Sequence, residues 1–112
     1  MANYRNRKLL DLAHRVQDCQ FRITGHCEGF SVYGCEPAHS NQIRHGKGTG
    51  LKAHDYCHVA ACRSCHDVYD GRAPSSLTKA EKTEYFEQGW EGTLARYFEN
   101  GWLDVTPEGK KR

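Results

Sequence analysis

Residues 34–71, GCEPAHSNQIRHGKGTGLKAHDYCHVAACRSCHDVYDG, decide the fold of this chain. A short extended run ends at His39, a glycine-rich loop follows, and the apolar run at 58–61 leads into Cys62-Arg63-Ser64-Cys65-His66. Because both runs are short and bounded by turn residues, we predict strand, loop and strand. Residues 67–70 can then form a short helix that stops at the following glycine.

The segments before this stretch are expected to pack on it. Residues 4–16 place leucines, Ala13 and Val16 among charges, which fits one apolar face of a short helix. Residues 18–35 are rich in glycine and cysteine and predict an irregular loop, with short extended pieces around residues 20–23.

The last third of the chain has helical periodicity and lacks cysteine and histidine. Thr78 and Glu81 form a capping-box pattern, which predicts a helix over about residues 78–88. A second helix is predicted to end near Gly101, with four apolar residues on one face: Trp90, Leu94, Tyr97 and Phe98. We interpret this face as core, because helical spacing is what packing requires and base stacking does not.

Length and composition predict one small α+β domain over residues 1–112, with a core at 19–71 and C-terminal helices at 76–101. The 112 residues are too few for two ordinary domains, and only 38% are hydrophobic. No signal peptide or membrane-spanning stretch is evident, so we expect a cytoplasmic protein with no membrane partner. The formal net charge is only +2, but basic residues predominate around the central histidines.

Four cysteines are predicted to bind a structural Zn²⁺. The Cys62-x2-Cys65 spacing lets one tight turn aim two sulfur atoms at a tetrahedral ion, and Cys19-x7-Cys27 can supply the other two. A redox role for the CxxC pair is disfavoured, because the βαβ surroundings typical of thioredoxin-like proteins are missing. The two remaining cysteines lack paired spacing and are interpreted as buried thiols, with zinc ligation as an alternative: Cys35 and Cys57.

Two histidines are candidates for hydrolysing a phosphodiester. His39 ends the first predicted strand, and His66 follows the CxxC pair, so a strand-strand-helix turn would bring them face to face. Phosphodiester hydrolysis requires a base to deprotonate water and a cation to neutralise developing charge. One imidazole can accept the proton while the other holds the metal, although His66 could instead join the zinc site.

These motifs in this order resemble the HNH nucleases, and specifically the small prophage-encoded YbcO-like nucleases. The resemblance covers residues 19–71 and includes the cysteine knuckle, the Ala38-His39 pair, the GKGTG loop, Asp55 and CxxCH. It implies a zinc-stapled ββα-metal core with a catalytic divalent cation such as Mg²⁺, Mn²⁺ or Ni²⁺. It also implies that His39 is the general base and that His66 is a metal ligand.

One departure from the HNH pattern concerns the cation site. Many HNH enzymes carry an acidic metal ligand directly before the general base, and here that position is Ala38. Asp55 could supply the missing carboxylate or orient His39, and Asn41 or His54 could also contribute. An ordinary loop-capping role for Asp55 is equally compatible with the sequence.

The glycine-rich loop is a candidate contact for the DNA backbone, through Arg44, Lys47 and Lys52. An ordinary surface loop is an equal alternative. By default, His45, His54 and His58 are expected to be exposed or to face DNA. The sequence thus predicts a metal-dependent DNA endonuclease of phage or prophage origin, with a non-catalytic zinc module that binds nucleic acid or protein as the alternative. Oligomeric state, DNA preference and activity on RNA stay open.

Overall fold

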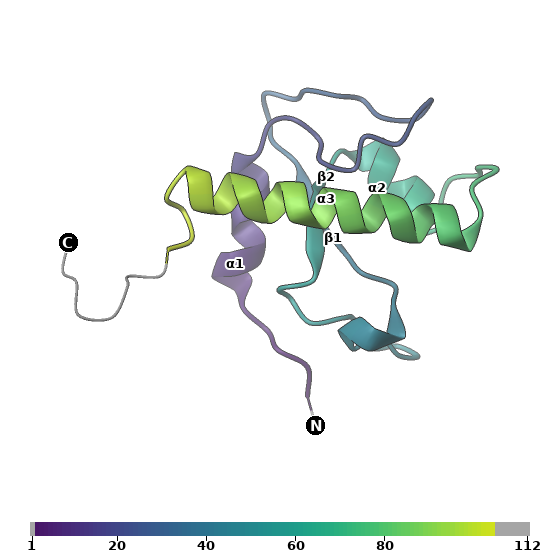
Figure 1. Cartoon of the computed structure of the whole chain (residues 1–112), viewed down its shortest axis with the longest axis horizontal. Coiled ribbons are helices and arrows are strands. Elements are labelled where there is room, and N and C mark those ends of the chain that lie inside the picture. Colours follow the sequence, from purple (N-terminus) through teal and green to yellow (C-terminus); the bar gives the residue numbers. More distant parts are fainter. Residues whose placement is uncertain (1, 105–112) are drawn as a thin grey trace.

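A computed structural model of the protein describes residues 2–104. The elements in chain order are α1 (Arg7–Asp11), the 3-10 helix η1 (Leu12–Arg15), β1 (Glu36–His39), the 3-10 helix η2 (Ile43–His45), β2 (His58–Ala61), α2 (Arg63–Tyr69) and α3 (Lys79–Glu99). This is a small α+β arrangement in which α3 runs across the two strands (Figure 1). None of the helices in this described part is long and apolar enough to cross a membrane.

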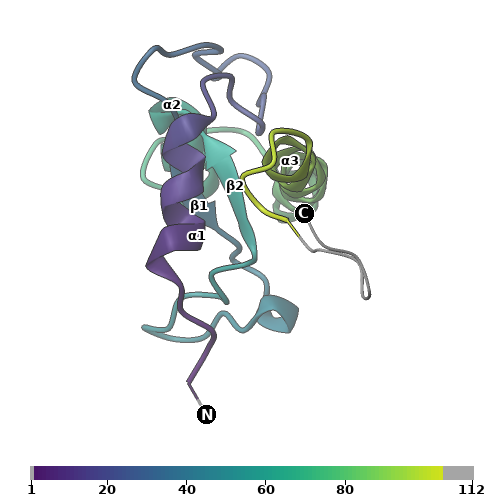
Figure 2. The ribbon, with the colours of Figure 1, turned by 90° about the vertical axis from the view of Figure 1, so that its left-hand side faces the viewer.

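The two predicted strands pair with each other. β1 and β2 form an antiparallel sheet in which Glu36 pairs with Ala61 and His39 with His58. The four residues of β2 are all buried, because η1 packs against both strands while α3 covers β2 from the other side (Figure 2). The predicted strand positions are therefore confirmed, and the sheet places His39 at one end of β1.

α2 begins earlier than the predicted 67–70 segment. Cys62 is its N-cap, and the Cys62 sulfur accepts a hydrogen bond from the Cys65 backbone N–H. The helix continues through His66 to Tyr69, and Gly71 follows with a φ of +80°, the left-handed conformation that glycine tolerates. The CxxC turn thus lies in the first helical turn rather than before it.

The C-terminal part is one helix, where two were predicted. The capping box of Thr78 and Glu81 is present, and α3 runs without interruption for 21 residues. Gly89 lies in its middle, where a Cβ atom would come within 2.8 Å of Val59 Cγ1 and 2.9 Å of the Gln20 carbonyl oxygen. The glycine is therefore a site of close approach between α3 and β2, not a break between helices.

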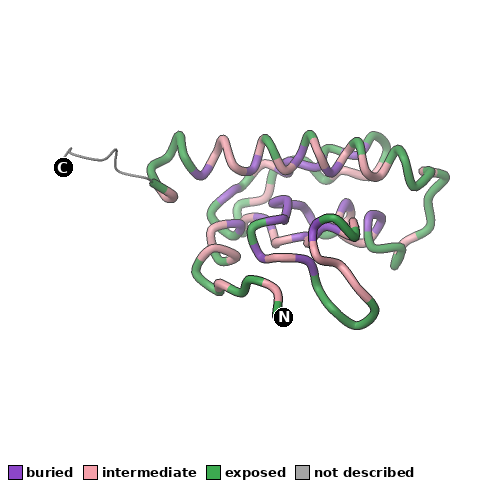
Figure 3. The backbone as a smooth tube through the Cα atoms, turned by 60° about the horizontal axis from the view of Figure 1, so that its bottom comes forward, coloured by how far each residue is buried: buried purple, intermediate pink, exposed green. Residues whose placement is uncertain are grey.

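The core is largely aromatic and lies beneath α3. Tyr69, Phe86 and Tyr97 are buried, and the rings of Phe21 and Tyr69 lie 4.8 Å apart. Along α3, buried residues alternate with partly buried and exposed ones (Figure 3). The predicted core role is confirmed for Tyr97 and, with partial burial, for two further side chains, Trp90 and Leu94. It is wrong for Phe98, which is 50% exposed near the end of the helix.

Two histidines expected at the surface are instead buried. His45 Nδ1 lies 2.6 Å from Ser40 Oγ. His58 Nδ1 lies 2.6 Å from the Asp55 carbonyl oxygen, and its Nε2 lies 2.8 Å from the Tyr97 hydroxyl. Since a carbonyl only accepts, His58 is neutral, with its proton on Nδ1. Burial lowers the pKa of His58 to about 4, even though the bond to the Asp55 carbonyl opposes this shift.

The stability of the protein is expected to fall in mild acid because of His58. A histidine whose pKa is lowered in the folded state makes its full contribution to the unfolding free energy above its unfolded pKa of about 6.5. This contribution is lost as the pH falls toward 4. We expect a loss of about 2 kcal/mol in unfolding free energy between about pH 7 and about pH 5. The His58→Gln protein should lack this pH-dependent part of the unfolding free energy. It should retain the parts that come from every other acid-sensitive group. Urea unfolding of both proteins at the two pH values measures the difference, and equal pH dependence would contradict the assignment.

Candidate functional site

The four predicted zinc ligands form one cluster. The sulfur atoms of Cys19, Cys27, Cys62 and Cys65 all lie within 4.8 Å of one another. Cys62 and Cys65 come from the start of α2, while the other two come from the loop that precedes β1. The structure thus brings together two pairs that are 35 residues or more apart in the chain, as the spacing predicted. The other two cysteines, Cys35 and Cys57, are buried free thiols outside the cluster.

Backbone amides surround the cysteine cluster with positive partial charge. The Cys62 N–H donates to Cys19 Sγ at 3.2 Å, the Glu28 N–H donates to Cys62 Sγ at 3.4 Å, and the Gly29 N–H donates to Cys27 Sγ at 3.3 Å. A hydrogen bond from Cys65 and the backbone amides of Arg22, Cys62 and Phe21 lower the pKa of Cys19 to about 5 against the opposing effect of burial. The same bond, together with burial, raises the pKa of Cys65. Since crowded thiolates repel each other, the set suits a soft cation with tetrahedral coordination.

A second group of polar residues surrounds a cleft of about 460 Å³ between the sheet and α2. Both His39, from the end of β1, and His66, from α2, line this cleft. The structure therefore unites the two histidines proposed for catalysis, as the strand-strand-helix prediction required. The other lining residues are Pro37, Ser40, Asn41, Lys47, Lys52, Tyr69, Asp70 and Arg72.

Asp55 contacts His39 and does not contact His66. Its Oδ1 lies 2.9 Å from His39 Nε2 and 3.1 Å from an Arg5 guanidinium nitrogen, and its Oδ2 accepts the Asn6 backbone N–H at 2.6 Å. Asp55 is only 3% exposed. Burial raises its pKa, but the hydrogen bonds from His39 and Asn6 and the charge of Arg5 outweigh burial and lower it. Asp55 was considered both as a cation ligand and as the residue that orients His39, and this geometry favours the second role.

Residues 3–6 fasten the loop that leads to Asp55. The Asn3 side-chain amide donates to the carbonyl oxygens of Gly46 and Lys52, at 2.7 and 2.8 Å. Arg5 donates to the carbonyl oxygens of Lys52 and Ala53, at 2.7 and 2.6 Å. This N-terminal strap, defined as residues 3–6, was missed by sequence reasoning, because no local pattern links it to a loop more than 40 residues away.

His66 is held between two carboxylates. Its Nδ1 lies 2.6 Å from Glu36 Oε1, and its Nε2 lies 3.1 Å from Asp70 Oδ2. Burial lowers the pKa of His66, but the two carboxylates outweigh burial and raise it. The pKa of Asp70 is lowered, because the hydrogen bonds from His66 and Arg72 outweigh burial.

Sequence reasoning did not identify either carboxylate partner of His66. The spacing of Asp70 was a usable signal, because residues four apart on a helix face each other. Glu36 gave no such signal, because it lies in β1, 30 residues before His66 in the chain. The acidic groups beside His66 are therefore Glu36 and Asp70. The alternatives weighed from the sequence have other partners: Asp55 contacts His39, Asn41 contacts Tyr69, and His54 contacts Tyr4.

Two of the three predicted DNA-contacting residues lie at this cleft. Lys47 and Lys52 line it together with Arg72. Arg44 does not line it and instead forms an ion pair with Glu87 of α3. The cleft is thus lined by two histidines that each contact a carboxylate, and by cationic side chains. This combination is suited to binding and hydrolysing a phosphodiester.

A protein-family model described as "Putative nuclease YbcO" matches residues 8–102. The chain belongs to the YbcO family. A solved structure titled as that of a "putative bacteriophage protein" from Escherichia coli is 26% identical to this YbcO-family chain, with a TM-score of 0.60. The match covers 82% of this chain and 98% of that one. No curated protein matches the chain.

The family match includes nearly all of the candidate site. In this YbcO-family protein, the cysteine cluster, His39, Asp55 and His66 all fall within the matched range. The N-terminal strap at residues 3–6 lies before it. Arg5 and Asn6, which hold the Asp55 carboxylate, are therefore contacts of this chain that the family match does not include.

Proposed function

We propose that this protein is a metal-dependent endonuclease of the HNH type that hydrolyses phosphodiester bonds in DNA. The observation that carries the proposal is that His39, His66, Asp70 and two lysines line one cleft. From outside the cleft lining, Asp55 contacts His39 and Glu36 contacts His66. The family description as a nuclease supports this chemistry. The bacteriophage title of the E. coli structure supports a phage or prophage origin.

In this mechanism, His39 removes a proton from the attacking water. Because the Asp55 carboxylate can only accept, His39 Nε2 carries a proton and Nδ1 has the free lone pair. Nδ1 is therefore the basic nitrogen, and the buried Asp55 carboxylate, which also pairs with the partly exposed Arg5, fixes the orientation of the ring. This arrangement of base and orienting carboxylate follows the logic of the serine-protease triad.

His66 and Asp70 are the residues that would hold the divalent cation. Glu36 accepts from Nδ1 of His66, which orients the ring and directs Nε2 toward Asp70. A nitrogen and a carboxylate oxygen suit ions such as Mn²⁺ and Ni²⁺ as well as Mg²⁺. When bound, the cation would supply positive charge for the phosphate and for the leaving oxygen.

The four-cysteine cluster is proposed to hold a structural Zn²⁺. Its four sulfur donors are all supplied by the protein, which is typical of structural rather than catalytic zinc. It joins the loop before β1 to the start of α2, the helix that carries His66. Zinc would therefore support the catalytic cleft by fixing this helix, without contacting the substrate.

Incubation with supercoiled plasmid, with and without Mg²⁺, Mn²⁺ or Ni²⁺, tests the proposal. We expect nicking by the zinc-loaded protein only when a divalent ion is added. His66→Ala and Asp70→Asn should each slow nicking by about 100-fold, because each removes a cation ligand. Asp67→Asn is the matched control, since Asp67 lies on the same helix, does not line the cleft, and pairs with Arg72 in the described part of the chain.

Failure of the folded, zinc-loaded protein to cut would contradict the nuclease proposal. The test therefore includes every ion on both plasmid and branched DNA. If such a protein still binds DNA, the result favours the non-catalytic zinc module. The absence of an acidic residue at position 38, where the Ala38 side chain is fully buried, is the feature consistent with that alternative.

A further inference from the structure

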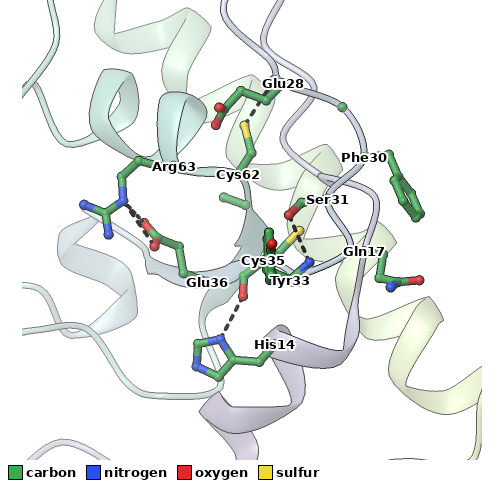
Figure 4. Close-up of a pocket in the computed structure, with 13 residues that line it drawn as sticks. His14, Gln17, Glu28, Phe30, Ser31, Tyr33, Cys35, Glu36, Cys62 and Arg63 are labelled. Carbon is green, nitrogen blue, oxygen red and sulfur yellow. Dashed lines mark hydrogen bonds and ion pairs between the residues drawn. The ribbon is translucent and has the colours of Figure 1, made fainter.

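Two more hollows continue from the catalytic cleft. A cavity of about 570 Å³ lies next to it, and the two share a wall, because Glu36 lines this cavity and contacts His66 of the cleft. Figure 4 shows this cavity between the Arg63–Glu36 pair on one side and Gln17 with Phe30 on the other. Gln17 and Phe30 also line a third hollow of about 410 Å³. The three hollows therefore lie in series, beginning at His66, and we call this series the track.

The loop at residues 28–34, which follows the Cys19-x7-Cys27 knuckle, presents aromatic side chains to solvent along this track. Phe30 is 63% exposed and Tyr33 is 90% exposed, and both line the cavity beside the cleft. Large aromatic side chains that stand exposed together on one short loop contribute little to packing and are a feature of binding surfaces. Val32, from the same loop, is 68% exposed and does not line the cavity.

The backbone of this loop is anchored. The Ser31 N–H donates to the Gln17 carbonyl, and the Cys35 N–H donates to the Val16 carbonyl, both at 2.8 Å. Gly34 has a φ of +84° and lies so close to the His14 carbonyl oxygen that a Cβ atom would overlap it at 1.9 Å. The aromatic rings are therefore presented by a pre-organised backbone, which reduces the entropy cost of binding.

Cations occur along the track, and most of its acidic groups pair with them, while Glu28 instead accepts a hydrogen bond from the Ser64 backbone N–H. Arg63 pairs with Glu36, Arg96 with Asp18, and Arg72 with Asp70. Within residues 2–104, no ion pair involves the lysines of the cleft or Arg15 of the third hollow: Lys47, Lys52 and Arg15. Cations without a carboxylate partner therefore lie at both ends of the track, with aromatic rings between them, and the Arg15 guanidinium lies 5.5 Å from the centroid of the Trp102 ring.

We propose that this track binds a single-stranded segment of nucleic acid next to the scissile bond, with bases stacked on Phe30 and Tyr33. Cations that follow the backbone together with exposed aromatic rings are the features that bind single strands without sequence readout. Bases within an intact duplex stack on one another and do not offer their faces to such a loop. The proposal rests on the proposed function and specifies its substrate as DNA with an unpaired strand beside the cleavage site.

Fluorescence anisotropy of labelled oligonucleotides tests this inference without cleavage. The parent protein carries His39→Ala and receives no added divalent ion. The probes are an oligothymidylate of about 12 nucleotides and a blunt duplex of the same length. We expect Phe30→Ala and Tyr33→Ala each to raise the Kd for the single strand by about tenfold, because stacking on one base is lost.

Matched variants separate stacking from general damage to the loop. Val32→Ala removes an exposed aliphatic side chain from the same loop and should leave the Kd within about twofold of the parent. Tyr33→Phe should bind as the parent does, because stacking requires the ring and not the hydroxyl. Metal content and thermal unfolding of each variant should match those of the parent, since these side chains are exposed.

Failure of this inference can be distinguished from failure of the proposed function. Single-strand binding by the parent that Phe30→Ala and Tyr33→Ala leave unchanged would overturn the track, as would tighter binding to the blunt duplex or no binding to the single strand. Plasmid nicking by the wild-type protein could still succeed in any of these cases. Conversely, aromatic-dependent binding by a protein that never cuts would support the track and reject the nuclease proposal.

Discussion

Replacing Cys65 with serine is expected to release the zinc and unfold the protein. Cys65 is fully buried among three other sulfur ligands, and a serine hydroxyl is a poor ligand for this soft thiolate site. Structural zinc contributes an apparent binding free energy of about 10–16 kcal/mol in small peptides, whereas an ordinary domain is stable by only about 5–15 kcal/mol. The loss of one ligand can therefore exceed the whole stability of the fold.

Zinc content per chain and far-UV circular dichroism measure this effect. Wild-type protein should bind one zinc ion and unfold when a strong chelator removes it. Cys57→Ala is the matched control, because Cys57 is also buried but lies outside the cluster, and its loss should cost only about 1 kcal/mol. A Cys65→Ser protein that remains folded without zinc, with an unchanged Tm, would show that the core alone sustains the fold.

Replacing His39 with alanine is expected to slow DNA nicking by about 10²–10⁴-fold, the usual contribution of a positioned general base. The substitution should lower the nicking rate at a saturating concentration of the divalent ion. It should leave the Kd for DNA unchanged, because the basic side chains of the cleft are unchanged. His26→Ala is the control, since His26 does not line the cleft. Nicking rates measured under single-turnover conditions separate this chemical step from product release.

Asp55→Asn distinguishes the two roles considered for this carboxylate. If Asp55 orients His39, as its 2.9 Å contact indicates, the substitution lowers the rate at saturating cation. If Asp55 is a metal ligand, the substitution instead raises the cation concentration needed for half the maximal rate. Equal nicking rates for wild-type, His39→Ala and Asp55→Asn proteins would reject the assignment of the base and of its positioning residue.

The main elements of the fold could be predicted from local patterns. The β2 residues form a short apolar run, and the Thr78–Glu81 pattern marks the start of α3. The pairing of Cys19 and Cys27 with the CxxC turn follows from the requirement of a tetrahedral ion for four ligands. These features are set by spacing and by the chemistry of single side chains, which are visible in one sequence.

The burial of particular residues could not be predicted in this way. Gly89 resembles a helix break in the sequence, yet it lets α3 approach Val59 and Gln20. His58 resembles a surface residue, yet it accepts a hydrogen bond from Tyr97, which is 39 residues away. Both outcomes depend on the packing of α3 against β2, and no local propensity encodes that contact.

The sequence by itself therefore determined the strand-strand-helix order, the cysteine set and the two central histidines, because these depend on short-range spacing. Only the tertiary structure decided which carboxylate serves which histidine. It assigned Asp55, with Arg5 of the N-terminal strap, to His39, and it assigned Glu36 and Asp70 to His66. The physical reason is that a hydrogen bond requires two groups to come within about 3 Å of each other. For residues up to 50 positions apart, that proximity exists only in the folded chain.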